Sequence, residues 1–256
     1  MPKVLVTDPI AQEGIDVLKR EAEVDVRLRP SPDELLQLVA DCDALVVRSE
    51  TKVTRDVIAA GARLQVIGRA GSGVDNIDTD AATERGVLVV NAPTGNIISA
   101  AEHTIALMLT LARHVPEAFE SLRAGRWERQ RFVGVELRGK TLGVVGLGQV
   151  GTEVARRARG MEMRVIAHDP YIMTERAQSL GVEAVSFDEL LAQSDFITLH
   201  TRLTDANRDM IGDEQLRMVK PNLRIVNTAR GELIDEAALI AALDEGRVAG
   251  AGIDVF

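Results

Sequence analysis

The sequence predicts an α/β protein with two domains, and three observations support this prediction. Its 256 residues are enough for about two domains. Short β-branched runs alternate with amphipathic segments, a pattern that indicates parallel strands joined by helices on both faces of a sheet. A glycine-rich motif, GLGQVG at Gly146–Gly151, lies between a predicted strand and a predicted helix.

The first ninety residues form an α/β unit of their own. A capping box, Ser31-Pro32-Asp33-Glu34, has proline at the first helical position and predicts a helix over Pro32–Ala40. Strands are predicted about every twenty residues. They are Val4–Thr7, Val24–Leu28, Ala44–Arg48, Gln65–Gly68 and Val87–Asn91.

A long helix is predicted next, beginning at a second capping box, Ser99-Ala100-Ala101-Glu102, and running to about Arg113. Apolar residues occupy most of its circumference, so we expect it to be buried on several sides, between domains or between subunits. The domain boundary is therefore predicted near Pro93–Asn96.

Strands and helices alternate again in the second half of the chain. Six strands make a nearly complete doubly wound domain. The strands are predicted near Thr141, Arg164, Val182, Asp195, Leu223 and Val248, and the helices near Val150, Glu175, Asp188, Asp213 and Asp235.

The GLGQVG motif is typical of a dinucleotide-binding turn. Gly146 permits the tight turn, Gly148 lets the backbone approach a pyrophosphate, and Gly151 lets helix and strand pack closely. Asp169, at the end of the next strand, can accept hydrogen bonds from a ribose 2′-OH but would repel a 2′-phosphate, which favours NAD over NADP. The alternative is a packing turn that binds no ligand.

Composition excludes several classes of partner. The formal net charge of -9 argues against nucleic acid and anionic membranes as partners. The single cysteine, Cys42, cannot form an internal disulfide, which fits a reducing compartment, and we expect the cytoplasm. The N-terminus is too strand-like for a signal peptide, and no apolar run is long enough to span a membrane. No metal site is predicted.

Four segments resemble the D-isomer-specific 2-hydroxyacid dehydrogenases, and the similarity extends from end to end. It implies a flavodoxin-like substrate domain, residues 1–95, and a Rossmann NAD-binding domain, residues 96–256. The WERQRF segment favours the members that act on 3-phospho-D-glycerate. The four segments are RAGSGVDNID (Arg69–Asp78), SAAEHT (Ser99–Thr104), GKTLGVVGLGQVG (Gly139–Gly151) and VNTARGELIDEAAL (Val226–Leu239).

The resemblance assigns a catalytic role to Arg230, which would hold the substrate carboxylate and polarise the reacting carbonyl. A guanidinium suits this role because its planar fork makes two charge-assisted hydrogen bonds to a carboxylate. The alternative is a surface arginine in a turn. The resemblance also implies backbone contacts from Gln149 and Val150 to the pyrophosphate. Further cofactor contacts would come from Thr201, Thr228, Ala229 and Asp254.

Arg48 and Arg69 end neighbouring strands of the N-terminal unit, where open α/β sheets form their ligand crevice. They suggest an anion site, which in similar enzymes takes the substrate phosphate; a structural ion pair is the alternative. The turn with Ser72 and Gly73 offers N–H groups to the substrate carboxylate. Asn96 is expected at a hinge, touching substrate or cofactor, although a turn or capping role is equally compatible.

The family uses a histidine as its proton donor and acceptor, assisted by a glutamate, and both are expected beyond Phe256. Of the histidines present, which include His103, His114 and His168, only His200 ends a strand near the cofactor. A strand-end histidine more often caps, packs or contacts cofactor. We therefore expect a weakly active or inactive form that lacks the C-terminal return of the substrate domain and the last edge strand of the Rossmann domain.

The expected function is NAD-dependent oxidation of 3-phospho-D-glycerate to 3-phosphooxypyruvate, at the entry to L-serine biosynthesis. The expected partners are this small-molecule substrate, a phosphorylated 2-hydroxy acid, and a second copy of the chain in a homodimer built on the long apolar helix. Two alternatives stay open. One is a related dehydrogenase acting on glycerate, glyoxylate or a branched 2-hydroxy acid, and the other is a non-catalytic NAD-binding module, similar to corepressors of this fold.

Overall fold

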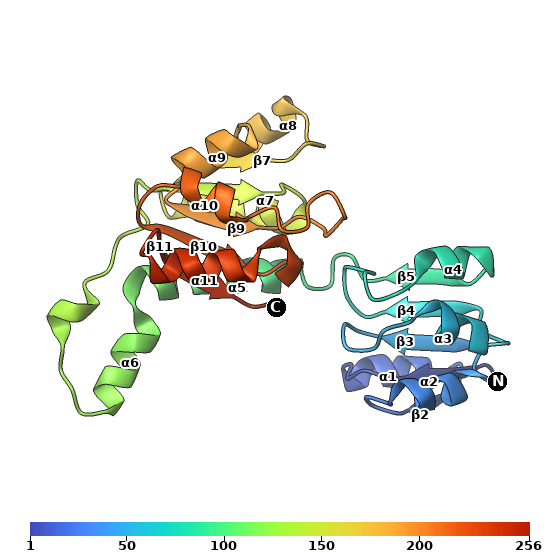
Figure 1. Cartoon of the computed structure of the whole chain (residues 1–256). Helices are drawn as coiled ribbons and strands as arrows, with labels where there is room; N and C mark the ends of the chain where they lie inside the picture. The colour runs from blue at the N-terminus through green and yellow to red at the C-terminus, as the bar shows by residue number, and fades with distance from the viewer. The chain divides into compact units, whose positions relative to one another are not determined.

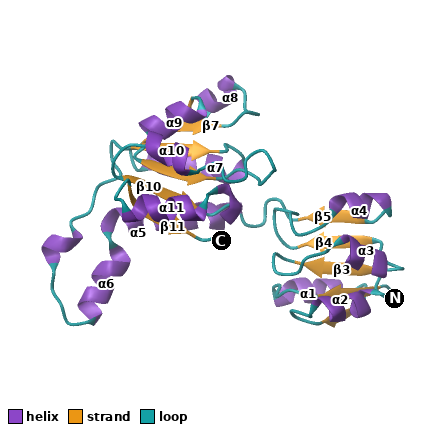
Figure 2. Ribbon diagram, viewed as in Figure 1, coloured by secondary structure: helices purple, strands orange, loops and turns teal.

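The computed structural model describes residues 1–256 and divides the chain into two compact units, Met1–Asn96 (unit 1) and Ile97–Phe256 (unit 2) (Figure 1). Both units alternate strands with helices, as Figure 2 shows. The α/β class predicted from the sequence is confirmed.

Unit 1 contains one parallel sheet with the strand order β2-β1-β3-β4-β5. This is the flavodoxin-like order, 2-1-3-4-5, in which the switch point lies between β1 and β3. Each strand lies within two residues of its predicted range. The strands are β1 (Lys3–Val6), β2 (Glu23–Val26), β3 (Ala44–Val47), β4 (Val66–Arg69) and β5 (Leu88–Asn91).

Alternate residues of the unit 1 strands point to opposite faces of the sheet. On one face Leu5, Leu45 and Ile67 are fully buried beneath α2, α3 and α4. On the other, Val4 and Val6 pack under α1. The capping box predicted for α2 is present. The Ser31 side chain accepts a hydrogen bond from the Glu34 N–H, and the Glu34 carboxylate accepts one from the Ser31 N–H. The helices are α1 (Gln12–Leu18), α2 (Pro32–Val39), α3 (Arg55–Ala60) and α4 (Thr79–Glu84).

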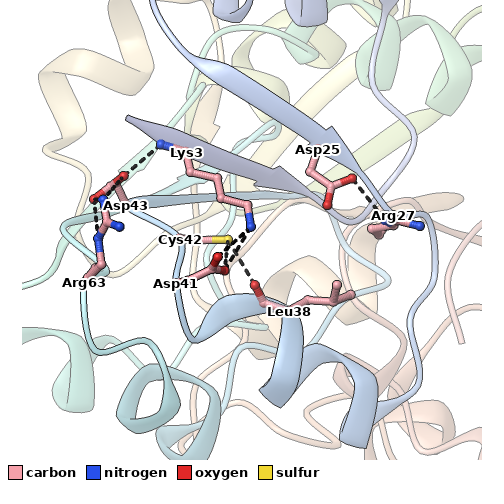
Figure 3. Close-up of polar contacts among 8 residues, drawn as sticks. All are labelled: Lys3, Asp25, Arg27, Leu38, Asp41, Cys42, Asp43 and Arg63. Carbon is pink, nitrogen blue, oxygen red and sulfur yellow. Dashed lines mark hydrogen bonds and ion pairs between the residues drawn. The ribbon is translucent and has the colours of Figure 1, made fainter. Parts of the chain in front are cut away.

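Polar contacts tie together the amino ends of β1 and β3 (Figure 3). The Asp43 carboxylate accepts from the Lys3 backbone N–H at 2.8 Å and from Arg63 at 2.8 Å. The Lys3 ammonium donates to Asp41 at 2.8 Å. Cys42 lies between these residues, fully buried, and donates to the carbonyl of Leu38. Burial raises the pKa of the Cys42 thiol, so it stays protonated and unreactive.

Unit 2 contains a six-stranded parallel sheet with the order β11-β10-β9-β6-β7-β8. Counted from β6, this is the doubly wound Rossmann order, 3-2-1-4-5-6, so the Rossmann prediction is confirmed. The strands are β6 (Thr141–Val145), β7 (Arg164–His168), β8 (Glu183–Ala184), β9 (Phe196–Leu199), β10 (Leu223–Asn227) and β11 (Val248–Ile253).

Two apolar layers enclose the unit 2 sheet. One contains Val144 and Val154 and the other contains Ile197 and Leu239, all nearly inaccessible to solvent. α5 and α7 contribute to the first layer, and α9 and α11 to the second. The helices are α5 (Ile97–Arg113), α7 (Gln149–Gly160), α8 (Thr174–Ser179), α9 (Phe187–Gln193), α10 (Asp213–Met218) and α11 (Glu236–Asp244).

α5 differs from its prediction in two ways. It begins at Ile97, so Ser99 lies inside its first turn and the predicted capping box does not form. Its fully buried residues, Ala101 to Ala112 at spacings of three and four, form one face against α7, β10 and β11. Ile98 and Leu109 are 49% and 42% exposed. Within the single chain these two residues are therefore uncovered, and the predicted burial on several sides would require a second subunit.

The segment 114–132, which we call the arm, follows α5 and was not predicted from the sequence. His114, in the left-handed region with φ of 51°, ends α5, and α6 (Val115–Arg123) begins there. A short 3₁₀ helix, η1 (Arg129–Phe132), follows before the chain returns to the sheet of unit 2. Figure 1 shows α6 extending away from that sheet. No helix of the structure is long and apolar enough to cross a bilayer.

Candidate functional site

The predicted cofactor residues gather at the carboxyl edge of the unit 2 sheet. The GLGQVG loop follows β6, and β6 lies between β7 and β9, so the loop sits at the point where the strand order reverses. Ligands of open α/β sheets bind at this point. The other predicted residues at this edge follow β7 (Asp169), β9 (Thr201), β10 (Thr228 and Ala229) and β11 (Asp254).

The three positions of the loop require glycine for different physical reasons. Gly146 has a φ of +89°, and a Cβ there would lie 2.8 Å from the carbonyl carbon of His200 and 2.9 Å from the Thr201 nitrogen. A Cβ at Gly151 would collide with the carbonyl oxygen of Gly146. Gly148 is different, because a Cβ there would meet no atom within 4 Å. Packing therefore explains the glycines at 146 and 151, whereas the space over Gly148 is open to a ligand.

The N-terminus of α7 is suited to an anion. Gly148 is its N-cap residue and provides no side-chain cap. The N–H groups of Gln149 and Val150 belong to the first turn, which has no intrahelical acceptors. Such N–H groups, together with the helix dipole, bind phosphate groups. The residues present therefore fit the diphosphate of a dinucleotide.

The Asp169 carboxylate is held beside this loop. Its Oδ2 accepts from the Leu147 N–H at 2.8 Å and its Oδ1 from the Tyr171 N–H at 2.9 Å. Each carboxylate oxygen can accept a second hydrogen bond. This geometry is compatible with a ribose hydroxyl as an additional donor.

A buried asparagine shapes the turn that carries Arg230. The Oδ1 of Asn227 accepts from the Ala229 N–H at 3.0 Å, and its Nδ2 donates to the Arg230 carbonyl at 2.7 Å. Asn227 is inaccessible to solvent, so these bonds form in a low-dielectric environment. Sequence reasoning missed this residue, although it lies within the VNTARG segment. The Arg230 side chain is half-buried and donates to the Ala229 carbonyl at 2.6 Å.

α5 also contacts the carboxyl edge of this sheet. His103 Nε2 lies 3.2 Å from Asp254 Oδ1, and the Thr104 hydroxyl lies 2.8 Å from that of Thr228. Two predicted cofactor residues are thus fixed by the first half of α5. Nothing in the local sequence pattern of either residue indicates this contact.

His200 is an unsuitable substitute for the expected catalytic histidine. Its Nε2 lies 2.7 Å from the Thr198 hydroxyl, and burial lowers the pKa of the imidazole to about 3. The ring is therefore neutral near pH 7 and provides no imidazolium as proton donor. The backbone carbonyl group of His200 lies against the Gly146 turn, where a Cβ on the glycine would be 2.9 Å from the carbonyl oxygen.

Unit 1 has a cavity at the carboxyl edge of its own sheet. Arg48 and Asn96 line it together with Pro9, Gly71 and Gly95. Arg48 is exposed and takes part in no salt bridge, so the ion-pair alternative does not apply to it; its guanidinium lies 3.5 Å from the Pro9 carbonyl.

The other predicted substrate residues of unit 1 lie outside this cavity lining. Arg69 ends β4, in register with Val47, and its guanidinium lies against Gly71. Ser72 and Gly73 follow in the same loop, where the Asn91 amide donates to the Ser72 carbonyl at 2.6 Å.

Residues 105–256 match the sequence family described as "D-isomer specific 2-hydroxyacid dehydrogenase, NAD binding domain". A D-3-phosphoglycerate dehydrogenase of Methanocaldococcus jannaschii is 54% identical over 257 residues, which are 100% of this chain and 49% of that protein. The chain spans about half the length of the curated relatives it matches.

Solved structures agree with the sequence comparison. The TT0316 protein of Thermus thermophilus is 36% identical with a TM-score of 0.91, over 99% of this chain and 81% of that one. A D-lactate dehydrogenase from Aquifex aeolicus, complexed with NAD and lactic acid, is 28% identical with a TM-score of 0.90, over 99% of this chain and 77% of that one.

Proposed function

The chain belongs to the D-isomer specific 2-hydroxyacid dehydrogenase family, and we propose that it oxidises 3-phospho-D-glycerate to 3-phosphooxypyruvate at the entry to L-serine biosynthesis, with NAD as cofactor. In this proposal unit 1 is the substrate-binding domain and unit 2 the NAD-binding domain. The name shared by the curated relatives supports the choice of substrate.

The choice of a phosphorylated substrate rests on the exposure of Arg48 and on its lack of a carboxylate partner. The protein has a formal net charge of -9, yet Arg48 is an exposed cation without a carboxylate partner, at the ligand edge of the unit 1 sheet. An anionic ligand must overcome the overall negative field through specifically placed cations. A phosphate group suits the site because guanidinium groups bind it through charge-assisted hydrogen bonds. Arg69, on the neighbouring strand, would assist.

The choice of NAD rests on the GLGQVG loop and Asp169. The open position over Gly148 and the uncapped first turn of α7 would hold the diphosphate. A carboxylate at Asp169 would bind the ribose hydroxyls and repel a 2′-phosphate. When bound, NAD supplies the hydride acceptor.

Arg230 is the residue of this chain that we assign to the reaction itself. Its guanidinium would hold the substrate carboxylate and stabilise the negative charge that the C2 oxygen gains as its hydroxyl proton is removed, before the hydride passes from C2 to NAD. Asn227 fixes the backbone of this turn through its two hydrogen bonds. Holding the reacting carbon in one orientation contributes to the rate by proximity.

Substrate binding tests the proposal. With NADH present no oxidation occurs, so calorimetry measures affinity alone. We expect 3-phospho-D-glycerate to bind at least about tenfold more tightly than D-glycerate, because the phosphate adds charge-assisted hydrogen bonds. Equal affinities would contradict the phosphate site and favour a related enzyme of unphosphorylated 2-hydroxy acids. Absence of binding by either acid would favour a non-catalytic NAD-binding module.

We also propose a homodimer in the cytoplasm, but one formed through the arm rather than through α5. The arm exposes apolar side chains, with Phe119 at 57% and Trp127 at 76% exposure, whereas the most exposed large apolar residue of α5, Ile98, is 49% exposed. Clustered exposed apolar residues are typical of protein interfaces. Phe119 and Trp127 line one hollow of this arm with Leu122 and Phe132.

Sedimentation of variants tests the dimer. We expect the wild-type chain to sediment as a dimer at micromolar concentration and Trp127→Glu to sediment as a monomer, since a buried charge destabilises an apolar interface. The matched control is Val17→Glu, which places the same charge at a 55% exposed apolar position on α1 of unit 1 and should leave the dimer intact. A monomeric wild type would rule out the arm interface.

A further inference from the structure

The loop that carries Arg48 is fixed by residues distant in sequence. The loop, Arg48–Thr51, follows β3 and has no regular secondary structure. Loops usually leave their backbone polar groups to water. In this one, the N–H and carbonyl groups of both Arg48 and Thr51 are bound by side chains instead.

Asp8 binds the N–H side of the loop. It lies two residues after the end of β1 and is inaccessible to solvent. Its Oδ2 accepts hydrogen bonds from the Arg48 N–H at 2.5 Å and from the Thr51 N–H at 3.2 Å. Its Oδ1 accepts from the Thr51 hydroxyl at 2.6 Å. A buried carboxylate is costly unless it is hydrogen-bonded, and here these bonds go to the loop.

Asn76 binds the carbonyl side of the same loop. Its Nδ2 donates to the Arg48 carbonyl at 2.7 Å and to the Thr51 carbonyl at 2.6 Å. Both protons of the amide are thereby used. The backbone carbonyl oxygen of Asn76 accepts a hydrogen bond from the Val53 N–H at 2.8 Å. This bond fixes Asn76 against the segment that follows the loop.

We propose that Asp8 and Asn76 are positioning residues that clamp the Arg48–Thr51 loop from its two sides and set substrate affinity through Arg48. The proposal rests on the proposed function, in which Arg48 binds the substrate phosphate. A long arginine side chain on a mobile backbone would lose conformational entropy on binding, whereas a fixed backbone removes part of this loss before the ligand arrives.

The chemistry explains why position 8 carries a carboxylate. The three donors approach both oxygens of the side chain. An asparagine has a single acceptor oxygen, so it can serve the two N–H groups only if its NH₂ group faces the Thr51 hydroxyl, which would then accept from it and donate to the Thr7 hydroxyl at 2.9 Å. The substitution Asp8→Asn therefore keeps the shape but replaces charge-assisted hydrogen bonds to the loop by weaker neutral ones.

The matched control is Asp43, at the opposite end of the same two strands (Figure 3). Asp43 is also buried, at 9% exposure, and it also connects β1 to β3 by accepting from a backbone N–H, that of Lys3. It lies at the amino edge, away from the Arg48 cavity. Asp43→Asn should therefore reduce stability without changing substrate affinity.

The experiment is a double-substitution cycle read out by calorimetry with 3-phospho-D-glycerate in the presence of NADH. We expect Asp8→Asn and Asn76→Ala to weaken substrate binding by about tenfold, the loss typical of a charge-assisted contact. NADH affinity should stay unchanged in both variants. In the Arg48→Ala background, Asp8→Asn should cause no further loss, because it acts through Arg48.

Two outcomes separate this inference from the proposed function. If Arg48→Ala weakens binding but Asp8→Asn does not, or if the two losses simply add, the clamp is wrong while the phosphate site stands. If Arg48→Ala leaves affinity unchanged, the phosphate role of Arg48 is wrong and the clamp fails with it. Should Asp8→Asn not fold, Asn76→Ala decides the question, because it removes both hydrogen bonds to the carbonyl side of the loop, and unchanged affinity in that variant would equally overturn the clamp.

Discussion

Gly148→Val should weaken NAD binding by about a hundredfold or more while leaving the melting temperature of the protein unchanged. A side chain at this position meets no protein atom within 4 Å, and the residue has an ordinary φ of -70°. The added methyl groups would instead occupy the space over the N-terminus of α7, where the diphosphate is expected. Calorimetric titration with NAD and thermal unfolding measure the two effects separately.

Gly146→Ala is the control with the opposite expectation. Its φ of +89° and the 2.8 Å approach to His200 mean that a methyl group strains the fold itself. The left-handed backbone alone costs about 1–2 kcal/mol for an L-residue. We expect a lower melting temperature in this variant. If Gly148→Val bound NAD as tightly as the wild type, the diphosphate would not lie over this loop.

Arg230→Ala should weaken 3-phospho-D-glycerate binding by about a hundredfold, measured with NADH present. Hydrogen bonds to charged groups contribute about 1.5–3 kcal/mol each, and a bidentate carboxylate contact contains two of them. NADH affinity should change little. The turn itself is held by Asn227, so removal of the Arg230 side chain leaves its backbone in place.

Arg230→Lys refines this test because it keeps the charge and removes the planar fork. A bidentate role predicts that lysine restores only part of the affinity. A lysine variant that binds like the wild type would indicate a simple charge effect. Unchanged affinity in Arg230→Ala would contradict its assignment to the substrate carboxylate.

Periodicity and capping signals predicted most of the fold. The ranges of the strands in unit 1 and the capping box at Ser31 follow from local pattern, because a strand or a helix start depends mainly on nearby residues. The predicted start of α5 is three residues late, since a capping box at Ser99 and Glu102 places the first helical residue at Ala100, whereas the helix begins at Ile97.

The arm was missed for a different reason. α6 exposes Val115, Phe119 and Leu122 to solvent. These apolar residues therefore do not pack into a hydrophobic core of the same chain. Its separation from α5 depends on a single left-handed residue, His114, which is not the glycine that usually marks this conformation. Apolar periodicity identifies a helix but not the surface that it faces.

The candidate site was predictable where a motif carries the chemistry and not where distant side chains support it. The glycines and Asp169 follow from the GLGQVG pattern and its spacing. Asp8 and Arg48 are 40 residues apart, and His103 and Asp254 are 151 residues apart. Such pairs form only after the strands and helices are assembled, so no local pattern indicates them.

The central claim is that unit 2 binds a dinucleotide by its diphosphate on backbone N–H groups and by its ribose on Asp169. Parallel calorimetric titrations of the wild-type chain with NAD and with NADP test it most directly. We expect saturable binding of one NAD per chain and at least about tenfold weaker binding of NADP, because a 2′-phosphate would face the Asp169 carboxylate. No heat with NAD, or equal affinity for the two dinucleotides, would contradict the claim.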